Sequence, residues 1–413
     1  MRETIPLKRQ AALITTCHDA GELPLIALDH IEPGTGHIIP GSGTKTLMPS
    51  AGAALVAPGD VAFAKLRPYL AKSMLVTGPS YASTELLAIR PAAGLDSRFL
   101  AYSVQARPFV EWTVATSEGT KMPRTSWEKV GSYPMPRLSL TEQRAIADFL
   151  DTETARIDAL ISKKRRMIDL LDERKAATML AAAGGRLTHA GPFEQSSLAW
   201  LSERPANWQE VLVRLVAKTG SGHTPSRERP DWWEDCTVPW ITTGEVAQVR
   251  SDEREEIVDT REKISEVGLA NSAAALRPQG TVVLCRTASA GYSGIMGVDM
   301  ATSQDFATWT CGSQLRPRYL LLCLRAMRPD LLGRLATGST HKTIYMPDIH
   351  ALRIPLPPLD QQDEVVEAAW RSLDPLFTAM ARLREQITLL HEHRQALITA
   401  AVTGDLGVPG VAT

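Results

Sequence analysis

The chain repeats itself, because a segment of about 220 residues occurs twice within its 413 residues. Residues of the first segment reappear, identical or closely similar, 219 to 221 positions later. The matched pairs include Leu140 and Leu359, Gln143 and Gln362, Glu173 and Glu392, Ala177 and Ala396, and, upstream of these, Lys65 and Arg286, Ser83 and Ser303, and Lys121 and Lys342. A unit of this length indicates a duplicated domain rather than a solenoid repeat. We therefore expect the order domain, helix, domain, helix.

A long helix is expected at the end of each copy, over residues 138–187 and 358–406. Each follows a proline-rich stretch in which a helix cannot run. Ser139 and Glu142 have the spacing of a capping box, and Asp360 is a suitable N-cap for the second helix. Both copies therefore carry a sequence signal for where the helix begins.

Apolar residues follow three-and-four spacing along both helices, close to the heptad pattern of a coiled coil. Because one chain contains two such helices, we expect them to pair as an antiparallel coiled coil. The alternatives are a helix packed on its own domain and a solvated coil between two chains. Glycines end both stripes, at Gly184-Gly185 and at Gly404, and Pro375 predicts a kink or a short break. The residues expected at the helix-pair interface are Ile157, Ile161, Ile168, Leu171, Leu376, Leu383, Ile387 and Leu390.

The rest of each copy has the pattern of a mixed α and β region. Aliphatic and β-branched runs bounded by Gly and Pro predict strands within residues 59–64 and 280–285, and residues 97–114 and 317–335 are predicted to be helical. The predicted fold class is α+β, with two tandem α/β domains each followed by a long helix. The predicted boundaries are 1–137 and 198–357 for the domains, 138–187 and 358–406 for the helices, 188–197 for a polar connector and 407–413 for a tail.

Composition narrows the possible functions. The chain is 44% hydrophobic and 22% charged, as in soluble proteins with buried cores. No apolar run approaches the roughly 20 residues of a membrane span, and the first residues lack the apolar core of a signal peptide, so we expect a cytoplasmic protein. Five dispersed cysteines without a C-x-x-C pair predict small buried side chains rather than disulfides or zinc ligands. A net charge of -1 argues against a generic polyanion binder and leaves a specific one open.

Signatures of catalysis are missing from the sequence. Residues 40–46 resemble a phosphate-binding loop but lack the glycine directly before the lysine, so we expect a flexible loop. The sequence contains no Asn-Pro-Pro-aromatic or Asp-Pro-Pro-aromatic motif of an amino-methyltransferase and no convincing nuclease arrangement. His391 and His393 are two residues apart on a helix and cannot share a metal as an i, i+4 pair could. We predict no catalytic residue, no metal site and no cofactor in this chain.

Residues 220–227, which read Gly-Ser-Gly-His-Thr-Pro-Ser-Arg, suit recognition of a nucleic acid. Small residues let the backbone approach a phosphate, hydroxyls and main-chain NH groups bind it, and arginine can make a bidentate contact with guanine. The alternative is an ordinary Gly/Ser loop beside tryptophans that anchor a core. Basic residues at matched positions add candidate phosphate contacts, with a solvated or structural role as their alternative. The candidate DNA-binding residues are Lys65, Arg67, Lys121, Arg124, Ser221, His223, Thr224, Arg227, Thr243, Arg286 and Lys342.

Together these features resemble the specificity subunit of type I restriction-modification systems. The helix ends LLDERKAATMLAAAGG and LLHEHRQALITAAVTG resemble two conserved regions of that family. The segments GSGHTPS, WW and VPWITTGEV resemble the start of a target recognition domain, ATGSTHKTIYMPDIHALRIPLPPL resembles its end, and ATSEGTKMPRTSWEKVGSYPMP is the counterpart in the first copy. The first helix departs from the second at its start, where PRLSLTEQ stands for PPLDQQ.

The resemblance implies a DNA-recognition subunit without catalytic activity. In that family, two target recognition domains each read half of a bipartite, asymmetric site in double-stranded DNA. The paired helices act as a ruler and dock two methyltransferase subunits, which motor-nuclease restriction subunits join. S-adenosylmethionine, Mg and ATP would be bound by those partners. The alternatives are a self-contained DNA-modifying enzyme, which the missing motifs disfavour, and a structural coiled-coil adaptor, which does not explain two duplicated globular halves.

Overall fold

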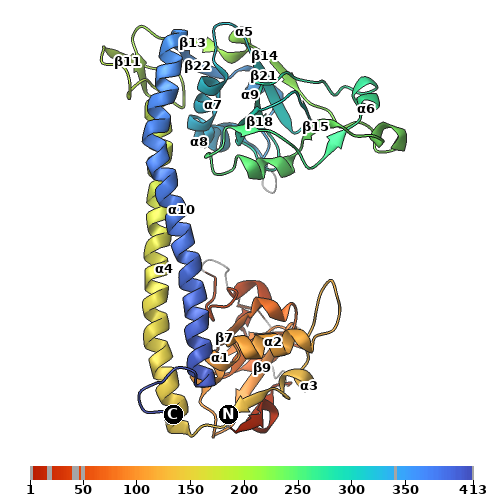
Figure 1. Cartoon of the computed structure of the whole chain (residues 1–413), viewed down its shortest axis with the longest axis vertical. Coiled ribbons are helices and arrows are strands. Elements are labelled where there is room, and N and C mark those ends of the chain that lie inside the picture. The colour runs from red at the N-terminus through yellow and green to blue at the C-terminus, as the bar shows by residue number, and fades with distance from the viewer. Residues whose placement is uncertain (1–2, 16–20, 40–45, 48–51, 339–341, 412–413) are drawn as a thin grey trace. The chain divides into compact units, whose positions relative to one another are not determined.

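The computed structural model describes residues 3–15, 21–39, 46–47, 52–338 and 342–411. The chain divides into two compact units (Figure 1). The first combines Met1–Arg165 with Arg384–Thr413, and the second is Arg166–Leu383. Because both boundaries fall inside the long helices, each unit contains one globular region and part of both helices. Cys17 and nearly all of the predicted flexible loop at 40–46 lie outside the described residues.

The globular region of the first unit stacks two four-stranded sheets under helices. The sheets have the strand orders β2-β9-β6-β7 and β4-β3-β8-β5. Phe63 packs with Phe99 on the helical side of the first sheet, whereas its neighbours Ala62 and Ala64 face a second core that contains Ile26. Alternate residues of β6 therefore serve two cores, as the pleat of a strand requires. The elements are β1 Thr4–Pro6, η1 Leu7–Arg9, β2 Ala11–Leu13, β3 Leu23–Ile26, η2 Leu28–His30, β4 Thr46–Leu47, β5 Ala54–Val56, β6 Val61–Ala64, η3 Pro68–Leu70, β7 Ser73–Leu75, β8 Ser80–Ala82, β9 Leu86–Pro91, α1 Ser97–Ser103, α2 Arg107–Ala115, α3 Trp127–Val130 and β10 Pro134–Pro136.

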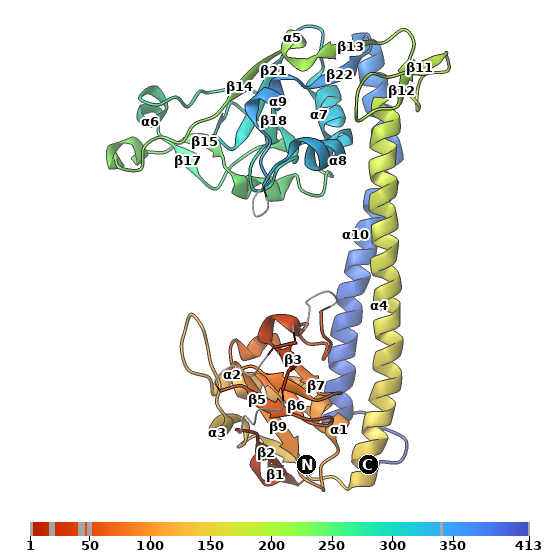
Figure 2. The same cartoon turned by 180° about the vertical axis from the view of Figure 1, so that it is seen from behind.

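The second unit repeats this plan with a larger sheet (Figure 2). A five-stranded sheet has the order β14-β21-β18-β19-β16, and a three-stranded sheet has the order β17-β15-β20. Leu284 packs with Leu320 of α7 on one face, and Val283 packs with Ile241 on the other. The elements are β11 Phe193–Gln195, β12 Glu203–Pro205, β13 Gln209–Leu212, α5 Val213–Val216, β14 Ala217–Ser221, η4 Pro230–Trp233, β15 Val238–Ile241, η5 Thr243–Gln248, β16 Glu256–Ile257, β17 Lys263–Ile264, α6 Glu266–Ala270, β18 Val282–Cys285, β19 Ser293–Met296, β20 Ala301–Thr302, β21 Phe306–Cys311, α7 Pro317–Ala326, α8 Arg328–Asp330, η6 Leu331–Leu335, α9 Met346–His350 and β22 Arg353–Leu356.

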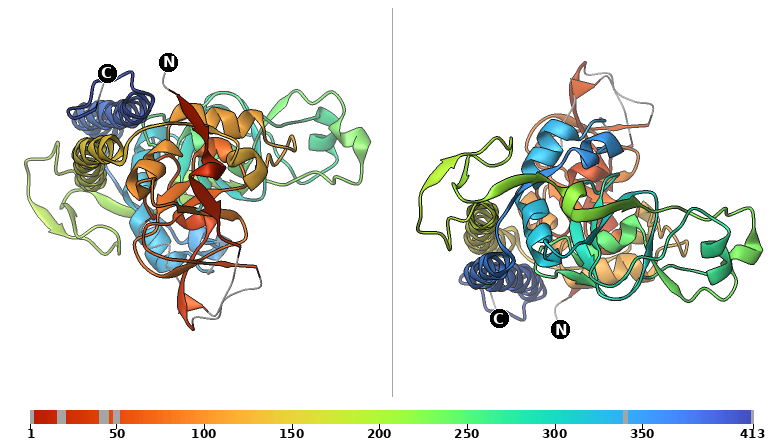
Figure 3. Two further views of the ribbon diagram at one scale, coloured as in Figure 1. Left: turned by 90° about the horizontal axis from the view of Figure 1, so that it is seen from below. Right: turned by 90° about the horizontal axis from the view of Figure 1, so that it is seen from above.

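The long helices are α4, Leu140–Ala183, and α10, Leu359–Thr403. In the first unit, Leu150 near the start of α4 shares a core with Ile398 near the end of α10. In the second unit, Ala182 near the end of α4 shares a core with Ala369 near the start of α10. The helices therefore pack together in antiparallel directions, and Figure 3 shows them side by side, seen end-on. The α+β fold class, with a long helix after each α/β region, is confirmed.

The starts of the two helices differ from each other. At α4, Ser139 N donates to Glu142 Oε2 over 2.9 Å and Glu142 N donates to Ser139 Oγ over 3.3 Å, so the predicted capping box is present. The predicted N-cap at Asp360 is wrong, because α10 already begins at Leu359 and the carbonyl of Pro358 accepts the first intrahelical hydrogen bond. The carboxylate still lies in the first turn, where it complements the positive helix end.

Both helices end at the predicted glycines, which is before the predicted bounds of 187 and 406, and α10 passes its proline without breaking. Gly185, two residues after the end of α4, and Gly404, directly after α10, have φ of 78° and 87°, the left-handed conformation that glycine adopts at low cost. The predicted short break at Pro375 is wrong, since α10 is continuous there. Leu373 and Leu376 on either side are buried in the core of the second unit, and this packing holds the helix. No helix in the described part of the chain is long and apolar enough to cross a membrane.

Three shorter segments also differ from the predictions. The helical stretch 97–114 is divided into α1 and α2, with Pro108 in the first turn of α2, and 317–335 is divided into α7, α8 and a π-helical turn, with Pro329 in α8. Proline favours a new first turn because its missing NH is not needed there. The predicted connector 188–197 contains β11, which pairs with β12.

A buried glutamine joins each long helix to its own globular region. Gln143 of α4 accepts from Asp96 N over 2.8 Å and donates to the carbonyls of Gly94 and Leu138 over 3.1 and 3.0 Å. Gln362 of α10 makes the same three hydrogen bonds, with Arg316 N at 2.8 Å and with the carbonyls of Gln314 and Pro357 at 2.9 Å each. The sequence repeat is therefore also a repeat of individual hydrogen bonds.

Candidate nucleic-acid interface

Polar groups of the second unit meet at the carboxyl ends of two parallel strands. β15 and β20 pair in parallel, with Ile241 opposite Thr302. The segments that follow carry Thr243 and Gln304 to the same edge of the sheet. Gln304 connects two candidates, because its carbonyl accepts from Arg286 Nε over 2.9 Å and its side-chain oxygen accepts from Thr224 Oγ1 over 2.6 Å.

The last residue of β14 and the loop after it bring two more candidates to this edge. Ser221 Oγ donates to the carbonyl of Phe306 over 3.2 Å, and His223 N donates to the carbonyl of Thr302 over 3.0 Å while the imidazole stays exposed. Gly222 makes this approach possible, since a Cβ at that position would lie 2.0 Å from the carbonyl oxygen of Thr302. The close passage of the loop over β20 therefore requires glycine.

Basic side chains stand beside this edge. The carbonyl of Arg286 accepts from Ile344 N over 2.8 Å, which places the segment that begins at Lys342 next to it. Lys342 Nζ is exposed and donates to the carbonyl of Leu332 over 3.0 Å. Among the described residues, no carboxylate pairs with either cation, so both remain available to an external anion.

Arg227 lies apart from this group. Its Nη2 donates to Glu262 Oε2 over 3.0 Å, and its guanidinium carbon lies 3.8 Å from the centroid of the Trp233 ring. Trp233 belongs with Trp240 to a separate small core. The structure therefore does not bring Arg227 together with Thr224 and Arg286, and its guanidinium would have to release Glu262 to contact a base.

The first unit has a corresponding group of cations. Lys65 Nζ donates to the carbonyl of Thr84 over 2.7 Å, and partial burial, aided by the nearby Arg124 charge, lowers the pKa of Lys65 from its usual value. Arg124 Nη2 lies 2.5 Å from both carboxylate oxygens of Glu85. Arg67 is exposed in a left-handed conformation with φ of 51°, held by its NH on the carbonyl of Pro123.

The same geometry anchors Lys65 and Arg286. Each donates to the carbonyl of a residue that stands at the matched position in its copy, Thr84 or Gln304. Each also accepts at its own carbonyl from a following segment, from Thr125 N over 2.9 Å or Ile344 N over 2.8 Å. Thr84 and Gln304 were missed by the sequence reasoning, and the repeat offset was the signal that could have found them.

Lys121 is exposed, and no described residue pairs with its ammonium group. It lies on the loop between α2 and α3, which also carries Arg124. The matched Lys342 lies on the loop between η6 and α9. Both lysines can therefore reach a phosphate without releasing a carboxylate.

The residues expected at the helix-pair interface are buried to different degrees. In the first unit, Ile157 and Ile161 of α4 are buried, and Ile387 and Leu390 of α10 are partly buried. In the second unit, Leu376 and Leu383 of α10 are buried, Leu171 packs against the core that contains Leu376, and Ile168 is partly buried.

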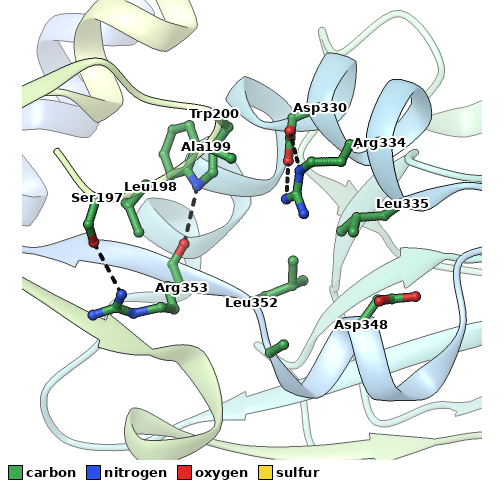
Figure 4. Close-up of a pocket in the computed structure, with 11 residues that line it drawn as sticks. Ser197, Leu198, Ala199, Trp200, Asp330, Arg334, Leu335, Asp348, Leu352 and Arg353 are labelled. Carbon is green, nitrogen blue, oxygen red and sulfur yellow. Dashed lines mark hydrogen bonds and ion pairs between the residues drawn. The ribbon is translucent and has the colours of Figure 1, made fainter.

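A pocket of about 260 Å³ lies in the second unit beside the segment that follows β11 (Figure 4). Trp200 Nε1 donates to the carbonyl of Arg353 over 3.2 Å, and Arg353 Nη1 donates to Ser197 Oγ over 3.2 Å. Arg334 forms a bidentate pair with Asp330, at 2.7 and 2.8 Å. The pocket is therefore the gap that remains where that segment packs against the rest of the globular region.

Groups suited to covalent or metal chemistry are not assembled in the described residues. No cluster of three or more His, Cys, Asp or Glu that could hold a metal occurs there. Burial raises the pKa of the Cys285 thiol to about 11 and those of Cys311 and Cys323 to about 12, so these thiols stay protonated near neutrality and are poor nucleophiles.

Comparisons with known proteins agree with this arrangement. The family described as the type I restriction modification DNA specificity domain matches residues 205–388. The type I restriction enzyme MjaIX specificity subunit of Methanocaldococcus jannaschii is 20% identical over 347 residues, which cover 82% of this chain and 74% of that protein. The StySPI specificity subunit of Salmonella potsdam is 22% identical over 326 residues, 77% of this chain and 67% of that protein.

A solved structure that concerns assembly and conformational transition of the type I R-M system contains a chain with the same fold. The TM-score is 0.68, at 19% identity, and 98% of both chains is covered. The family match over the second copy agrees with the two specificity subunits that align with most of the chain. Residues 205–388 belong to the family of the type I restriction modification DNA specificity domain, and most of the chain is similar to the specificity subunits of type I restriction enzymes.

Proposed function

We propose that this chain reads a bipartite, asymmetric site in double-stranded DNA, with each globular region reading one half. The observation that carries this proposal is the matched anchoring of Lys65 on Thr84 and of Arg286 on Gln304. The cation and its carbonyl are repeated, while the neighbours differ, since Glu85 lies beside Lys65 and Thr224 beside Arg286. Two copies with a common backbone contact and different polar surroundings suit two unlike half-sites.

The exposed basic residues supply phosphate contacts in this proposal. Lys121 and Lys342 occupy matched loops, and removing either by substitution with alanine is expected to weaken binding to all duplexes alike. Each phosphate contact contributes about 0.9 to the slope of log affinity against log salt, so each variant should have a slope shallower by about one. Unchanged slopes for both Lys121→Ala and Lys342→Ala would contradict the assignment.

The polar group at the end of β15 and β20 supplies base contacts. Thr224 and Thr243 offer hydroxyls, Ser221 ends β14 directly before the loop that crosses this edge, and the exposed His223 imidazole can donate or accept. Substitution of such a residue should change preference at one position of one half-site rather than affinity for every duplex.

We also propose that α4 and α10 dock two methyltransferase subunits, which restriction subunits then join. S-adenosylmethionine, Mg and ATP belong to those partners. The test is to express the chain with methyltransferase subunits in a host without DNA methylation and to map the methylated adenines. A two-part asymmetric sequence is expected, and neither component alone should produce it. Methylation by this chain alone would support a self-contained enzyme, and loss of DNA binding in the assembled complex would support a structural adaptor.

The same assay tests whether the helices set the distance between half-sites. Seven residues inserted into each helix, after Arg165 and before Arg384, keep the apolar stripe in register and add about 10 Å of helix. One base pair is about 3.4 Å, so the spacer should lengthen by about three base pairs with both half-sites unchanged. An altered half-site with the original spacer would refute the ruler role.

A further inference from the structure

One sheet face of the second unit carries two cations, Lys218 and Arg277, for which the described residues supply no acidic partner. Arg277 is held by its backbone, which exchanges hydrogen bonds of 2.8 and 3.0 Å with Met300. Its guanidinium lies over β14 at Gly220, where a Cβ would be 2.3 Å from Nη2 and 2.8 Å from Cζ. Glycine at this position therefore admits the guanidinium, and any other residue would displace it.

The surroundings of Arg277 do not neutralise it. Thr308 lies opposite Gly220 on β21 and is 1% exposed, yet its Oγ1 has no hydrogen-bond partner in the described structure, and neither has Arg277 Nε. Lys218 lies two residues before Gly220, hence on the same face of β14, and is exposed. Within the ranges that the structure describes, neither Lys218 nor Arg277 forms an ion pair.

In the first copy, the corresponding sheet carries an arginine that is paired with a carboxylate. β2 pairs with β9 as β14 pairs with β21, and Arg90 of β9 stands where Thr310 stands in the second copy. Arg90 Nε and Nη2 donate to the two carboxylate oxygens of the buried Asp60 over 2.8 and 2.6 Å. The arginine of the first copy thus has a counter-ion within the protein. A partly buried guanidinium without such a counter-ion, as at Arg277, is costly unless an external anion neutralises its charge.

We propose that Lys218 and Arg277 form a binding strip for the phosphodiester backbone that flanks the half-site read by the second region. This inference rests on the proposed function. The strip is continuous with the candidate base-reading loop, because Gly220 directly precedes Ser221. The guanidinium fork suits the paired oxygens of a phosphate, and the flexible lysine adds a point charge. The described residues of the first region contain no equivalent strip, so the two halves hold DNA with unequal electrostatic strength.

The test measures binding of the full chain, in complex with its methyltransferase partners, to a duplex of arbitrary sequence at several salt concentrations. Arg277→Met and Lys218→Ala should each make the log-log salt slope shallower by about 0.9. Lys218→Glu supplies Arg277 with an internal carboxylate and should remove both contacts, a change of about twice that size. Arg334→Met is the matched control, since Arg334 is paired with Asp330 in the same unit and should leave the slope unchanged.

The outcomes separate this inference from the proposed function. If the wild-type complex does not bind duplex DNA with a salt-dependent slope, the proposed function itself fails. If the wild type binds and the slope is the same in Arg277→Met, Lys218→Ala and Lys218→Glu, the strip is wrong and Arg277 only covers the sheet. Lys218 is exposed, so its variants decide the question even if Arg277→Met does not fold. A shallower slope in Lys218→Glu alongside an unchanged Arg334→Met supports the strip.

Discussion

Replacing Gln362 by leucine is expected to destabilise the second unit strongly. The side chain is 0% exposed and makes three hydrogen bonds, one with Arg316 N and two with the carbonyls of Gln314 and Pro357. Leucine preserves much of the volume but leaves one NH and two carbonyl groups without their partner. Each unpaired buried group costs about 1–3 kcal/mol, and since a second hydrogen bond or water can serve some of them, we expect a total of about 3 kcal/mol.

Urea unfolding followed by tryptophan fluorescence reports this loss, because Trp112 and Trp127 belong to the first unit and the other seven of the nine tryptophans to the second. With a denaturant dependence of about 3 kcal/mol per molar urea, the midpoint should fall by about 1 M. The neighbouring Gln361 is the control, since it accepts one hydrogen bond, from Trp208 Nε1 over 3.0 Å. Gln361→Leu should cost only about 1 kcal/mol. Equal shifts in Gln361→Leu and Gln362→Leu would refute the reasoning.

Three further outcomes are expected. Arg394 is 3% exposed and donates to two backbone carbonyls, whereas Lys175 at the matched position is less buried. Arg394→Met should therefore lower the melting temperature of the full chain more than Lys175→Met, and the reverse order would contradict this. Burial raises the pKa of Glu210, but hydrogen bonds from Ser197 and Ser196 outweigh this effect and lower the pKa from 4.5 to about 2. The stability advantage of the wild type over Glu210→Gln should therefore be full above pH 4.5 and vanish as the pH falls towards 2, as acid-unfolding curves would show. If Arg227 reads a guanine, Arg227→Ala should cost about 1–3 kcal/mol and relax preference at that one position of the methylated site, whereas an equal loss on all duplexes would make it a phosphate contact.

Local signals predicted much of the scaffold, and long-range contacts explain the rest. The capping box of Ser139 and Glu142 could be predicted because its partners are three residues apart. The identity of Gln143 and Gln362 was visible in the repeat, but their role was not, since the partners of Gln143 include backbone groups 47 and 49 residues away. In contrast, the N-cap predicted at Asp360 was two positions too late, because the carbonyl of Pro358 already accepts the first intrahelical hydrogen bond.

The candidate interface was predictable in part for the same reason. The matched offset indicated Lys65 and Arg286 as equivalent, and the structure anchors both in one geometry. The position of Arg277 over Gly220 depends on how two distant segments meet across a sheet, and no motif encodes it. The pairing of Arg227 with Glu262, 35 residues away, is likewise a tertiary contact that a loop pattern does not predict.

The division of the chain into a continuous and a discontinuous unit orders events during its synthesis. Arg166–Leu383 is a single stretch that can complete its core while still attached to the ribosome, but the core that surrounds Leu150 lacks Ile398 and Val402 until the last residues are made. At about 5–20 residues per second, this gap lasts roughly 10 to 45 s. The first region to be translated is thus the last to complete its core. Loss of the C-terminal end of α10 would therefore expose apolar side chains of the N-terminal globular region.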